Sequence, residues 1–356
     1  MDRNFGAFWN NKKVLITGHN GFKGTWLSLM LEYLGAKVYG YALLPQAEGF
    51  YRKAKPHMSG EKIGDIRDER EVYTSIEKFQ PEIIIHLASH STIDPKAELT
   101  HYIFETNTMG VVNVLEAAQK VLSVQAVLVV TSDKCYKNLE SDEAYSERSL
   151  LGAQDPYSTS KACQELVTEC YRNSFFGEDK KNIRVATARA SNVIGGGDYN
   201  LSRLIPSLLN DLLKKGYAEI RKPNAVRPWQ NVLDVLYGYL LLAKALYETS
   251  ADNMEICAAF NFGPRIDGFL TVEEVAQRAC GLLPGGRYIV KKDMNVVPET
   301  VTLKLNSSKA ERVLGWFPKY QFNDTLKMTF DFLRREEKGE NVKIIAMEYI
   351  EKTLGE

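Results

Sequence analysis

The fold is decided by the stretch from Lys13 to Gly24, which reads KVLITGHNGFKG. Residues 13–17 form an apolar run of strand length, and a glycine-rich turn separates them from an amphipathic helix that stops at Gly35. A second strand-like run, residues 37–42, follows directly. A strand, a tight turn, a helix and a second strand within about thirty residues predict a βαβ unit.

The glycines of the turn have the spacing G-x-x-G-x-x-G. Gly18 permits a tight turn, Gly21 lets backbone N–H groups approach a pyrophosphate, and Gly24 lets the helix pack closely on the sheet. Because the amino terminus of a helix also attracts anions, the turn is predicted to bind a dinucleotide. Between the glycines, His19 and Asn20 can equally shape the loop, and Lys23 can equally face solvent. The predicted cofactor contacts in the turn are Gly18, His19, Asn20, Gly21, Phe22, Lys23 and Gly24.

The segment in which an acid usually binds the adenosine ribose lies about twenty residues beyond the glycines. Here it reads Leu43-Leu44-Pro45, without an Asp. No Arg for a 2′-phosphate is present either, which favours NAD over NADP. Asp65 and Ile66 are candidate adenine contacts, although Asp65 can equally serve as a turn or helix-cap residue.

Strands and helices continue to alternate beyond the first unit, which predicts a Rossmann-type doubly wound parallel sheet with helices on both faces. The carboxyl-terminal third is less regular and predicts a smaller, interleaved α/β substrate-binding lobe. Strands are expected at 82–88, 125–131 and 183–190, and helices at 108–121 and 156–176. In the last third, helices are expected at 204–215, 232–249, 271–283 and 323–335, with short apolar segments at 260–263 and 288–290.

The composition of the 356 residues limits the possible functions. Lys+Arg and Asp+Glu both number 45, so no broad basic surface for nucleic acid is expected. The five cysteines form no C-x-x-C pair, which argues against a disulfide framework or a zinc site and favours a cytoplasmic location. The start of the chain lacks a signal-peptide core, and the most apolar stretch, 232–247, is interrupted by Asp234 and Lys244. We therefore expect no membrane segment.

A second motif supplies chemistry. Tyr157 and Lys161 are four residues apart in a predicted helix, so their side chains share one face. A phenol has a pKa near ~10, and a neighbouring ammonium favours the phenolate. Ser132 precedes the pair by 25 residues and could hydrogen-bond the same substrate oxygen. Such a base beside a dinucleotide is suited to moving a hydride to or from an alcohol carbon.

Several segments resemble the extended short-chain dehydrogenases/reductases. They are TGHNGFKG at 17–24, Leu87-Ala88-Ser89, Asn107 and Asn113 within TNTMGVVNVLEAA, and YSTSK at 157–161. Within this family, segments 131–136, 195–198, 227–230 and 261–264 are similar to those of the sugar-nucleotide 4,6-dehydratases. Related dehydratases carry Glu at the position of Lys134, and the Lys points to the branch that acts on CDP-glucose.

The resemblance implies NAD as the cofactor, CDP-glucose as the small-molecule substrate, and no metal. The implied reaction oxidises C4 of the sugar, removes water across C5 and C6, and returns the hydride to C6. The product would be CDP-4-dehydro-6-deoxy-D-glucose. Residues 1–190 and about 225–262 would form the NAD-binding Rossmann domain, and about 191–224 and 263–356 the nucleotide-sugar-binding domain.

The implied catalytic residues are Ser132, Asp133, Lys134, Tyr157 and Lys161. Tyr157 would act as base toward the C4 hydroxyl, and Lys161 would also hold the nicotinamide ribose. Asp133 would protonate the departing hydroxide, and Lys134 would take the C5 proton or stabilise the enolate. The alternative for Asp133 and Lys134 is a solvated pair in a loop. Beyond Tyr157 and Lys161, further implied cofactor contacts are Leu87, Ala88, Ser89, Asn107 and Thr131.

Asn192, Arg227 and Glu299 would bind the substrate, Arg227 through the diphosphate. The chain departs from the family pattern at Asn231, Pro298 and Asn306, which affects the substrate contacts.

A sugar-nucleotide 4-epimerase, a dehydratase for another nucleotide sugar and a non-catalytic dinucleotide sensor are the alternatives. The epimerase would need no Asp133-Lys134 pair, and a sensor would be expected to lack Tyr157. The resemblance also implies a homodimer through helices 108–121 and 156–176 and a role in deoxysugar synthesis for lipopolysaccharide O-antigen.

Overall fold

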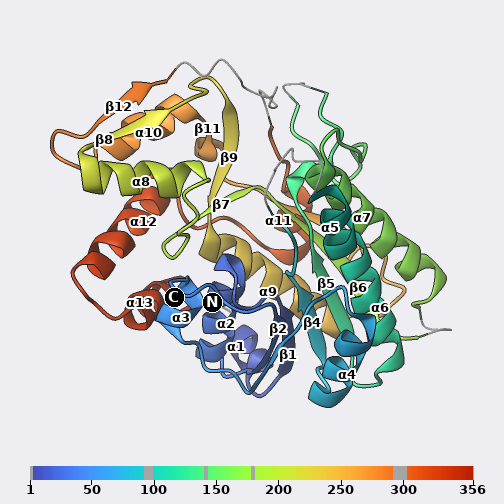
Figure 1. Cartoon of the computed structure of the whole chain (residues 1–356). Coiled ribbons are helices and arrows are strands. Elements are labelled where there is room, and N and C mark those ends of the chain that lie inside the picture. Colours follow the sequence, from blue (N-terminus) through green and yellow to red (C-terminus); the bar gives the residue numbers. More distant parts are fainter. Residues whose placement is uncertain (1–2, 92–98, 140–142, 178–180, 292–302, 356) are drawn as a thin grey trace.

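A computed structural model of the chain describes residues 3–91, 99–139, 143–177, 181–291 and 303–355. Its centre is a parallel sheet of seven strands in the order β3-β2-β1-β4-β5-β6-β10, with helices on both faces (Figure 1). The Rossmann-type doubly wound fold is therefore confirmed. The strands are β1 (Lys13–Thr17), β2 (Lys37–Ala42), β3 (Gly60–Ile63), β4 (Ile83–His86), β5 (Ala126–Val130), β6 (Arg184–Ala190) and β10 (Ala259–Phe262).

The strand order reverses at β1, which lies between β2 and β4. Thr17, the last residue of β1, is in register with Tyr41 of β2 on one side and with His86 of β4 on the other. In doubly wound sheets, ligands bind beyond the carboxyl ends of the strands at such a reversal. The glycine turn leaves β1 at this point.

The two faces of the sheet bury separate clusters of apolar side chains. Val14 and Ile16 of β1 belong to one cluster and Leu15 to the other, as expected for alternating side chains. The first cluster includes residues of α1 (Arg3–Trp9), α2 (Phe22–Tyr33), α3 (Phe50–Ala54), α9 (Val232–Glu248), α11 (Ser308–Leu314) and α13 (Val342–Leu354). The second includes residues of α4 (Glu69–Phe79), α6 (Gly110–Lys120) and α7 (Pro156–Ser174).

A second group of elements, at the upper left of Figure 1, surrounds its own apolar cluster. Its strands form two small sheets, β11-β9-β7 and β12-β8. The members are β7 (Asn192–Ile194), α8 (Leu204–Lys215), β8 (Tyr217–Ile220), β9 (Val226–Asn231), β11 (Phe269–Thr271), α10 (Val272–Cys280), β12 (Arg287–Val290) and α12 (Phe322–Glu337). Because α9 and β10 lie between these segments in the chain and pack with the main sheet, the chain crosses between the two groups more than once. The proposed domain boundaries remain a prediction.

The structure contains elements that the sequence patterns did not reveal. β9 includes Arg227 and Gln230, both buried, so its polar sequence did not indicate a strand. The helix expected at 108–121 is preceded by α5 (Thr100–Phe104) and a π-helical turn at Glu105–Met109. The other missed elements are α1, α3, α4, α11, α13, β3, β7, β8, β11 and the short helices Asp133–Cys135 and Ile266–Gly268.

The start of α7 is fixed by local sequence. The Asp155 side chain accepts a hydrogen bond of 2.9 Å from the backbone N–H of Ser158, and Pro156 occupies the first helical turn. This cap places Tyr157 in the first turn and Lys161 one turn later.

Asn231, one of the departures from the family pattern, has a comparable role for α9. Its side-chain oxygen accepts a bond of 2.8 Å from the N–H of Leu233. An N-cap of this kind is favoured by Asn.

The packing of α2 on the turn predicts that Gly24 and Gly21 respond differently to substitution. A Cβ at Gly24 would lie 2.1 Å from the carbonyl oxygen of Gly18, whereas the nearest atom to a Cβ at Gly21 would be 3.5 Å away. We expect Gly24→Ala to lower the free energy of unfolding, measured by urea denaturation, by about 2–3 kcal/mol because backbone atoms must move. The control Gly21→Ala should change it by less than about 1 kcal/mol. Equal losses in the two variants would contradict this account of the packing.

Candidate active site

The candidate site lies beyond the carboxyl ends of β1, β4 and β5. Gly18 has a φ of +72°, and a Cβ there would lie 2.8 Å from the backbone nitrogen of Ala88. Gly21 is the N-cap residue of α2, and no side chain caps the N–H groups at the amino terminus of that helix. Glycine at 18 and 24 lets the turn and the start of α2 pack this closely, and the resulting helix amino terminus beyond β1 fits a cofactor pyrophosphate.

The polar side chains of the glycine turn have different surroundings. His19 is fully buried over Gly40, and its Nε2 lies 3.2 Å from a Glu61 carboxylate oxygen. The Asn20 side chain donates a hydrogen bond of 2.6 Å to the Leu43 carbonyl, which ties the turn to the end of β2. Burial lowers the pKa of His19, so a neutral imidazole shapes the loop. These contacts favour the loop-shaping alternative for both side chains.

Lys23 points toward the centre of the site. Its Nζ lies 3.4 Å from the hydroxyl of Tyr239, a buried residue of α9. Burial lowers the pKa of Lys23 to about 8. The positive charge of Arg203 lowers this pKa further, whereas the negative charge of Asp133 raises it. The solvent-facing alternative for Lys23 is therefore wrong.

At the predicted adenine end, Asp65 is engaged by a neighbour. Its carboxylate accepts bonds from the Arg67 guanidinium, the shortest at 2.7 Å, and these bonds lower the pKa of Asp65. Ile66 is buried, and its carbonyl accepts a bond of 2.9 Å from the side chain of Asn113 on α6. Asp65 therefore stays ionised at neutral pH.

Asn107, in the π-helical turn, joins the loop after β4 to α7. Its side chain accepts a bond from the Ser89 hydroxyl at 3.0 Å and donates one to the Ser160 hydroxyl at 2.8 Å. Its carbonyl accepts a bond of 2.7 Å from Gln164, whose side-chain oxygen in turn accepts one of 2.9 Å from Lys161. This chain of bonds sets the position of the Lys161 ammonium.

Tyr157 and Lys161 are both buried, and the Lys161 Nζ lies 5.8 Å from the centre of the Tyr157 ring. Burial raises the pKa of Tyr157 to about 12, while a hydrogen bond with Ser132 lowers it. Burial and the charge of Lys23 lower the pKa of Lys161 to about 7. Burial is thus the largest effect on both groups, and Ser132 and Arg203 lower the pKa of Tyr157. That a protonated Lys161 favours the phenolate stays a prediction.

Asp133 is 1% exposed, which excludes the alternative of a solvated loop residue. Its Oδ1 accepts a bond of 2.9 Å from the Ser132 hydroxyl, and its Oδ2 meets no partner within the part of the chain that the structure describes. Burial raises the pKa of Asp133, opposed by the charges of Lys134, Lys23 and Arg227. A buried carboxyl group with one unused oxygen is suited to donating a proton.

The predicted substrate residues come from the second group of elements. Arg227, on β9, is buried, and its charge reaches Asp133. Asn192 begins β7, in register with Trp229 of β9. Glu299 and Pro298 lie outside the described residues. Asn306, the third departure, accepts a bond of 2.9 Å from the N–H of Ser308 at the start of α11.

Thr131 directly follows β5, and its buried hydroxyl donates to Glu165 of α7 in the interior. Its predicted cofactor contact stays a prediction. Sequence reasoning also missed Arg203 and Tyr239, whose neighbours are Lys23, Tyr157 and Asp133. Tyr239 lies within an apolar helix and Arg203 directly precedes one, so neither belonged to a recognisable motif.

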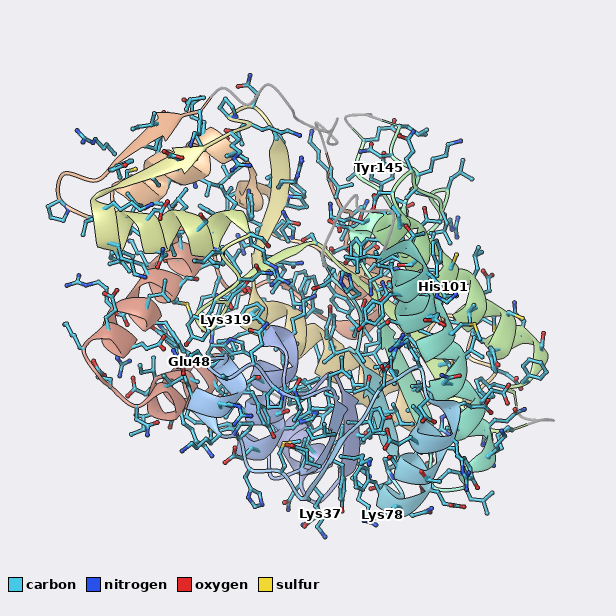
Figure 2. The ribbon with its side chains drawn as sticks, viewed as in Figure 1. Lys37, Glu48, Lys78, His101, Tyr145 and Lys319 are labelled. Carbon is cyan, nitrogen blue, oxygen red and sulfur yellow. The ribbon has the colours of Figure 1, made fainter. Side chains whose placement is uncertain are left out.

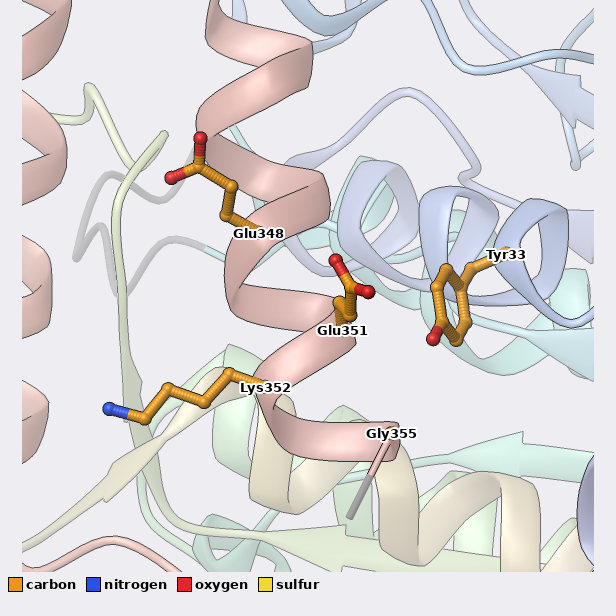
Figure 3. A pocket seen from close by; sticks show the side chains of 5 residues that line it. All are labelled: Tyr33, Glu348, Glu351, Lys352 and Gly355. Atoms are coloured by element: carbon orange, nitrogen blue, oxygen red, sulfur yellow. The ribbon is translucent and has the colours of Figure 1, made fainter.

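A separate hollow of about 460 Å³ is lined by Tyr33, Glu348, Glu351, Lys352 and Gly355 (Figure 3). Tyr33 ends α2, whereas the glycine turn precedes the first residue of that helix. Twelve helical residues span about 18 Å, so this hollow is not part of the candidate site. In Figure 2, Lys37, at the start of β2, lies at the lower edge of the view and Tyr145 lies near the upper edge.

Two further features of the described residues concern metals and membranes. None of their His, Cys, Asp and Glu side chains form a group that could hold a metal ion. Within the same residues, no helix combines the length and the apolarity needed to cross a membrane.

Comparison with known proteins gives one family and several relatives. The model of the NAD dependent epimerase/dehydratase family matches residues 14–257. A CDP-glucose 4,6-dehydratase from Salmonella typhimurium is 39% identical over 97% of this chain and 96% of its own length. A dTDP-glucose 4,6-dehydratase from Haemophilus influenzae is 25% identical over 89% of this chain and 96% of its own length.

Among solved structures, a dTDP-glucose 4,6-dehydratase from Streptomyces venezuelae, a double mutant with NAD and DAU bound, has a TM-score of 0.75. It is 23% identical and covers 92% of this chain and 98% of its own. This similarity supports the fold.

The low pKa of Lys161 predicts a pH dependence of stability. Between about pH 7 and 10, the unfolded chain binds a proton at Lys161 that the folded protein does not, so this group makes the free energy of unfolding rise with pH. We expect the wild type to gain up to about 1.4 kcal/mol per pH unit relative to Lys161→Met in urea denaturation. Lys37→Met, which removes an exposed lysine, is the control. Parallel pH profiles for the wild type and Lys161→Met would contradict the burial of a titrating amine.

Proposed function

The chain belongs to the NAD-dependent epimerase/dehydratase family, and on that basis we propose that it is a CDP-glucose 4,6-dehydratase, a hydro-lyase with NAD as retained cofactor. The observation that carries the proposal is the buried Asp133 beside Ser132 and Tyr157, because an acid at this place serves elimination and has no task in 4-epimerisation. The similarity to the Salmonella enzyme over almost the whole chain supports CDP-glucose as the substrate.

The proposed reaction is a net loss of water. NAD would supply the hydride chemistry, as acceptor from C4 and donor to C6, so that the cofactor would end as it began. The C6 hydroxyl leaves as water, and C5 loses a proton in the elimination and regains one when C6 takes up the hydride. The proton lost from the C4 hydroxyl balances the water, and the product is CDP-4-dehydro-6-deoxy-D-glucose. The residues of this chain move the protons and hold the charges.

Tyr157 takes the proton of the C4 hydroxyl. With a pKa of about 12 it is mostly protonated at neutral pH, so the site must favour its phenolate during the reaction. The Ser132 hydroxyl already bonds the phenol, and Arg203 adds positive charge nearby. Lys161 is held by Gln164 one turn along α7, where a proton on its amine would favour the phenolate further.

Asp133 and Lys134 carry out the elimination. Once C4 is a carbonyl, the C5 proton becomes acidic because its loss gives an enolate. Lys134 takes this proton if neutral, or stabilises the enolate if charged. Asp133, whose raised pKa keeps its proton available, gives that proton to the departing C6 hydroxyl.

Arg227, Asn192 and Glu299 are proposed to bind the nucleotide part of the substrate, with Arg227 on the diphosphate. Lys23 and Arg227 bring positive charge to Asp133, and Arg203 brings it to Tyr157, which suits a substrate that carries two phosphates. The glycine turn, Asp65, Ile66 and the segment Leu87–Ser89 are proposed to bind NAD, with Asn107 holding that segment in place.

A homodimer through α6 and α7 is part of the proposal. Leu166 of α7 and Phe175, the residue directly after it, are 55% and 42% exposed, and the proposed interface would cover them. All five cysteines are free thiols, which suits the proposed cytoplasmic location. The role in deoxysugar synthesis for lipopolysaccharide O-antigen stays a prediction.

The function is tested by comparing CDP-, dTDP-, UDP- and GDP-glucose as substrates, without and then with added NAD. We expect a 4-keto sugar that absorbs in alkali, with kcat/KM for CDP-glucose at least about tenfold above the others, because the site must discriminate the base through buried polar contacts. Formation of CDP-galactose without a keto sugar would establish the epimerase instead. Preference for another nucleotide would reassign the substrate.

The roles of the acid and the base are separated by two variants. Asp133→Asn should lower product formation by about 10²–10⁴-fold while C4 oxidation continues, so reduced cofactor should accumulate and be seen by absorbance. Tyr157→Phe, the control for the first step, should form neither product nor reduced cofactor although NAD still binds. If Asp133→Asn lost oxidation to the same extent as elimination, Asp133 would have another role.

A further inference from the structure

The six residues Thr131–Tyr136, here called the catalytic segment, are tied at both ends to one buried ion pair. The pair joins Glu165 of α7 to Arg189 of β6 at 2.7 Å, with side chains only 3% and 5% exposed. Ser132, Asp133 and Lys134 lie between the two attachment points. The structure thus connects the proposed acid to the ion pair from both sides.

The first attachment is at the carboxylate. Thr131, which directly precedes Ser132, donates its hydroxyl hydrogen bond to Glu165 Oε1. Thr187 of β6 donates to Oε2 at 2.7 Å, beside the Arg189 guanidinium. Three donors therefore hold the Glu165 carboxylate in one orientation, and Thr131 fixes the start of the catalytic segment to it.

The second attachment is at the guanidinium. Arg189 Nη1 donates to the hydroxyl of Tyr136 at 2.8 Å and to the carbonyl of Glu147 at 3.2 Å. The Tyr136 hydroxyl in turn donates to the side-chain oxygen of Asn261 on β10 at 2.7 Å. The Tyr136 ring stacks on Tyr145 with centroids 5.3 Å apart. The end of the catalytic segment is therefore fixed to β6 and β10.

The same pair also reaches the catalytic helix. Glu165 follows Lys161 by four residues on α7, which is about one turn. Any shift of the ion pair would thus move the catalytic segment relative to Tyr157 and Lys161. A displacement of about 1 Å can lower a catalysed rate by about 10²-fold.

A buried ion pair is by itself weak evidence for stability, because the loss of hydration offsets much of the attraction. Its connections are more informative, since each partner bonds one end of the catalytic segment. We propose that Glu165 and Arg189 are positioning residues, which hold Asp133 and Lys134 in register with Tyr157 for the elimination step. The proposal rests on the proposed dehydratase function.

The test removes one attachment without changing the fold. Tyr136→Phe deletes the hydroxyl that hydrogen-bonds Arg189 and Asn261 and keeps the stacking on Tyr145 and the cation–π contact with Arg189. Tyr145→Phe is the matched control, because its buried hydroxyl bonds the Leu139 N–H and the Asn138 side chain instead. We expect Tyr136→Phe to lower kcat at least tenfold with KM for CDP-glucose within twofold. Reduced cofactor should build up during turnover, as elimination falls behind oxidation, whereas Tyr145→Phe should keep wild-type values.

A second measurement needs no substrate. Hydrogen exchange followed by mass spectrometry should show at least threefold faster exchange of peptides covering 131–136 in Tyr136→Phe than in Tyr145→Phe. Thr131→Val, which removes the other attachment, should have the same effect and carries the test if Tyr136→Phe does not fold. Equal exchange in Tyr136→Phe, Thr131→Val and the control, or wild-type kcat in both attachment variants, would overturn the proposal. If the wild type turned over none of the four nucleotide sugars, the proposed function would fail while the exchange result still decided whether the pair positions the segment.

Discussion

The close approach of α2 to the end of β1 is the constraint on which the site depends. With glycine at 18 and 24, the backbone of the turn lies so close to Ala88, in the segment after β4, and to its own atoms that a side chain would have no room. This contact sets the α2 amino terminus directly beyond the β1–β4 reversal. The proposed pyrophosphate site, Lys23 and the segment after β4 all take their places from it.

Burial is the second effect that shapes the site, because it raises the pKa values of both Asp133 and Tyr157, the two residues proposed to transfer protons. The same removal from water that raises the pKa of Asp133 keeps its proton available, and it makes the phenolate of Tyr157 depend on its neighbours. Those neighbours come from distant parts of the chain: Ser132 follows β5 and Arg203 precedes α8. The site therefore exists only when the two groups of elements are packed together.

Local sequence predicted the elements whose signals are local. The glycine turn, the βαβ unit and the Tyr157–Lys161 spacing follow from neighbours within one or two turns, and the structure places them as expected. β9 was missed because Arg227 and Gln230 are buried by tertiary contacts that a pattern of apolar residues cannot reveal. The interior contact of Thr131 with Glu165 was missed for the same reason, since 34 residues separate the partners.

The sequence by itself thus determined the doubly wound fold, the dinucleotide turn, and the residue types for hydride and proton transfer. These properties depend on the spacing of residues that are close to one another in the chain. Only the tertiary structure decided the pKa values of these residues and therefore which of them hold a proton. The pKa values of Tyr157, Lys161 and Asp133 depend on loss of water and on charges brought from Lys23, Arg203 and Arg227. Electrostatic effects of this kind follow distance in space and burial, and neither is contained in the order of residues along the chain.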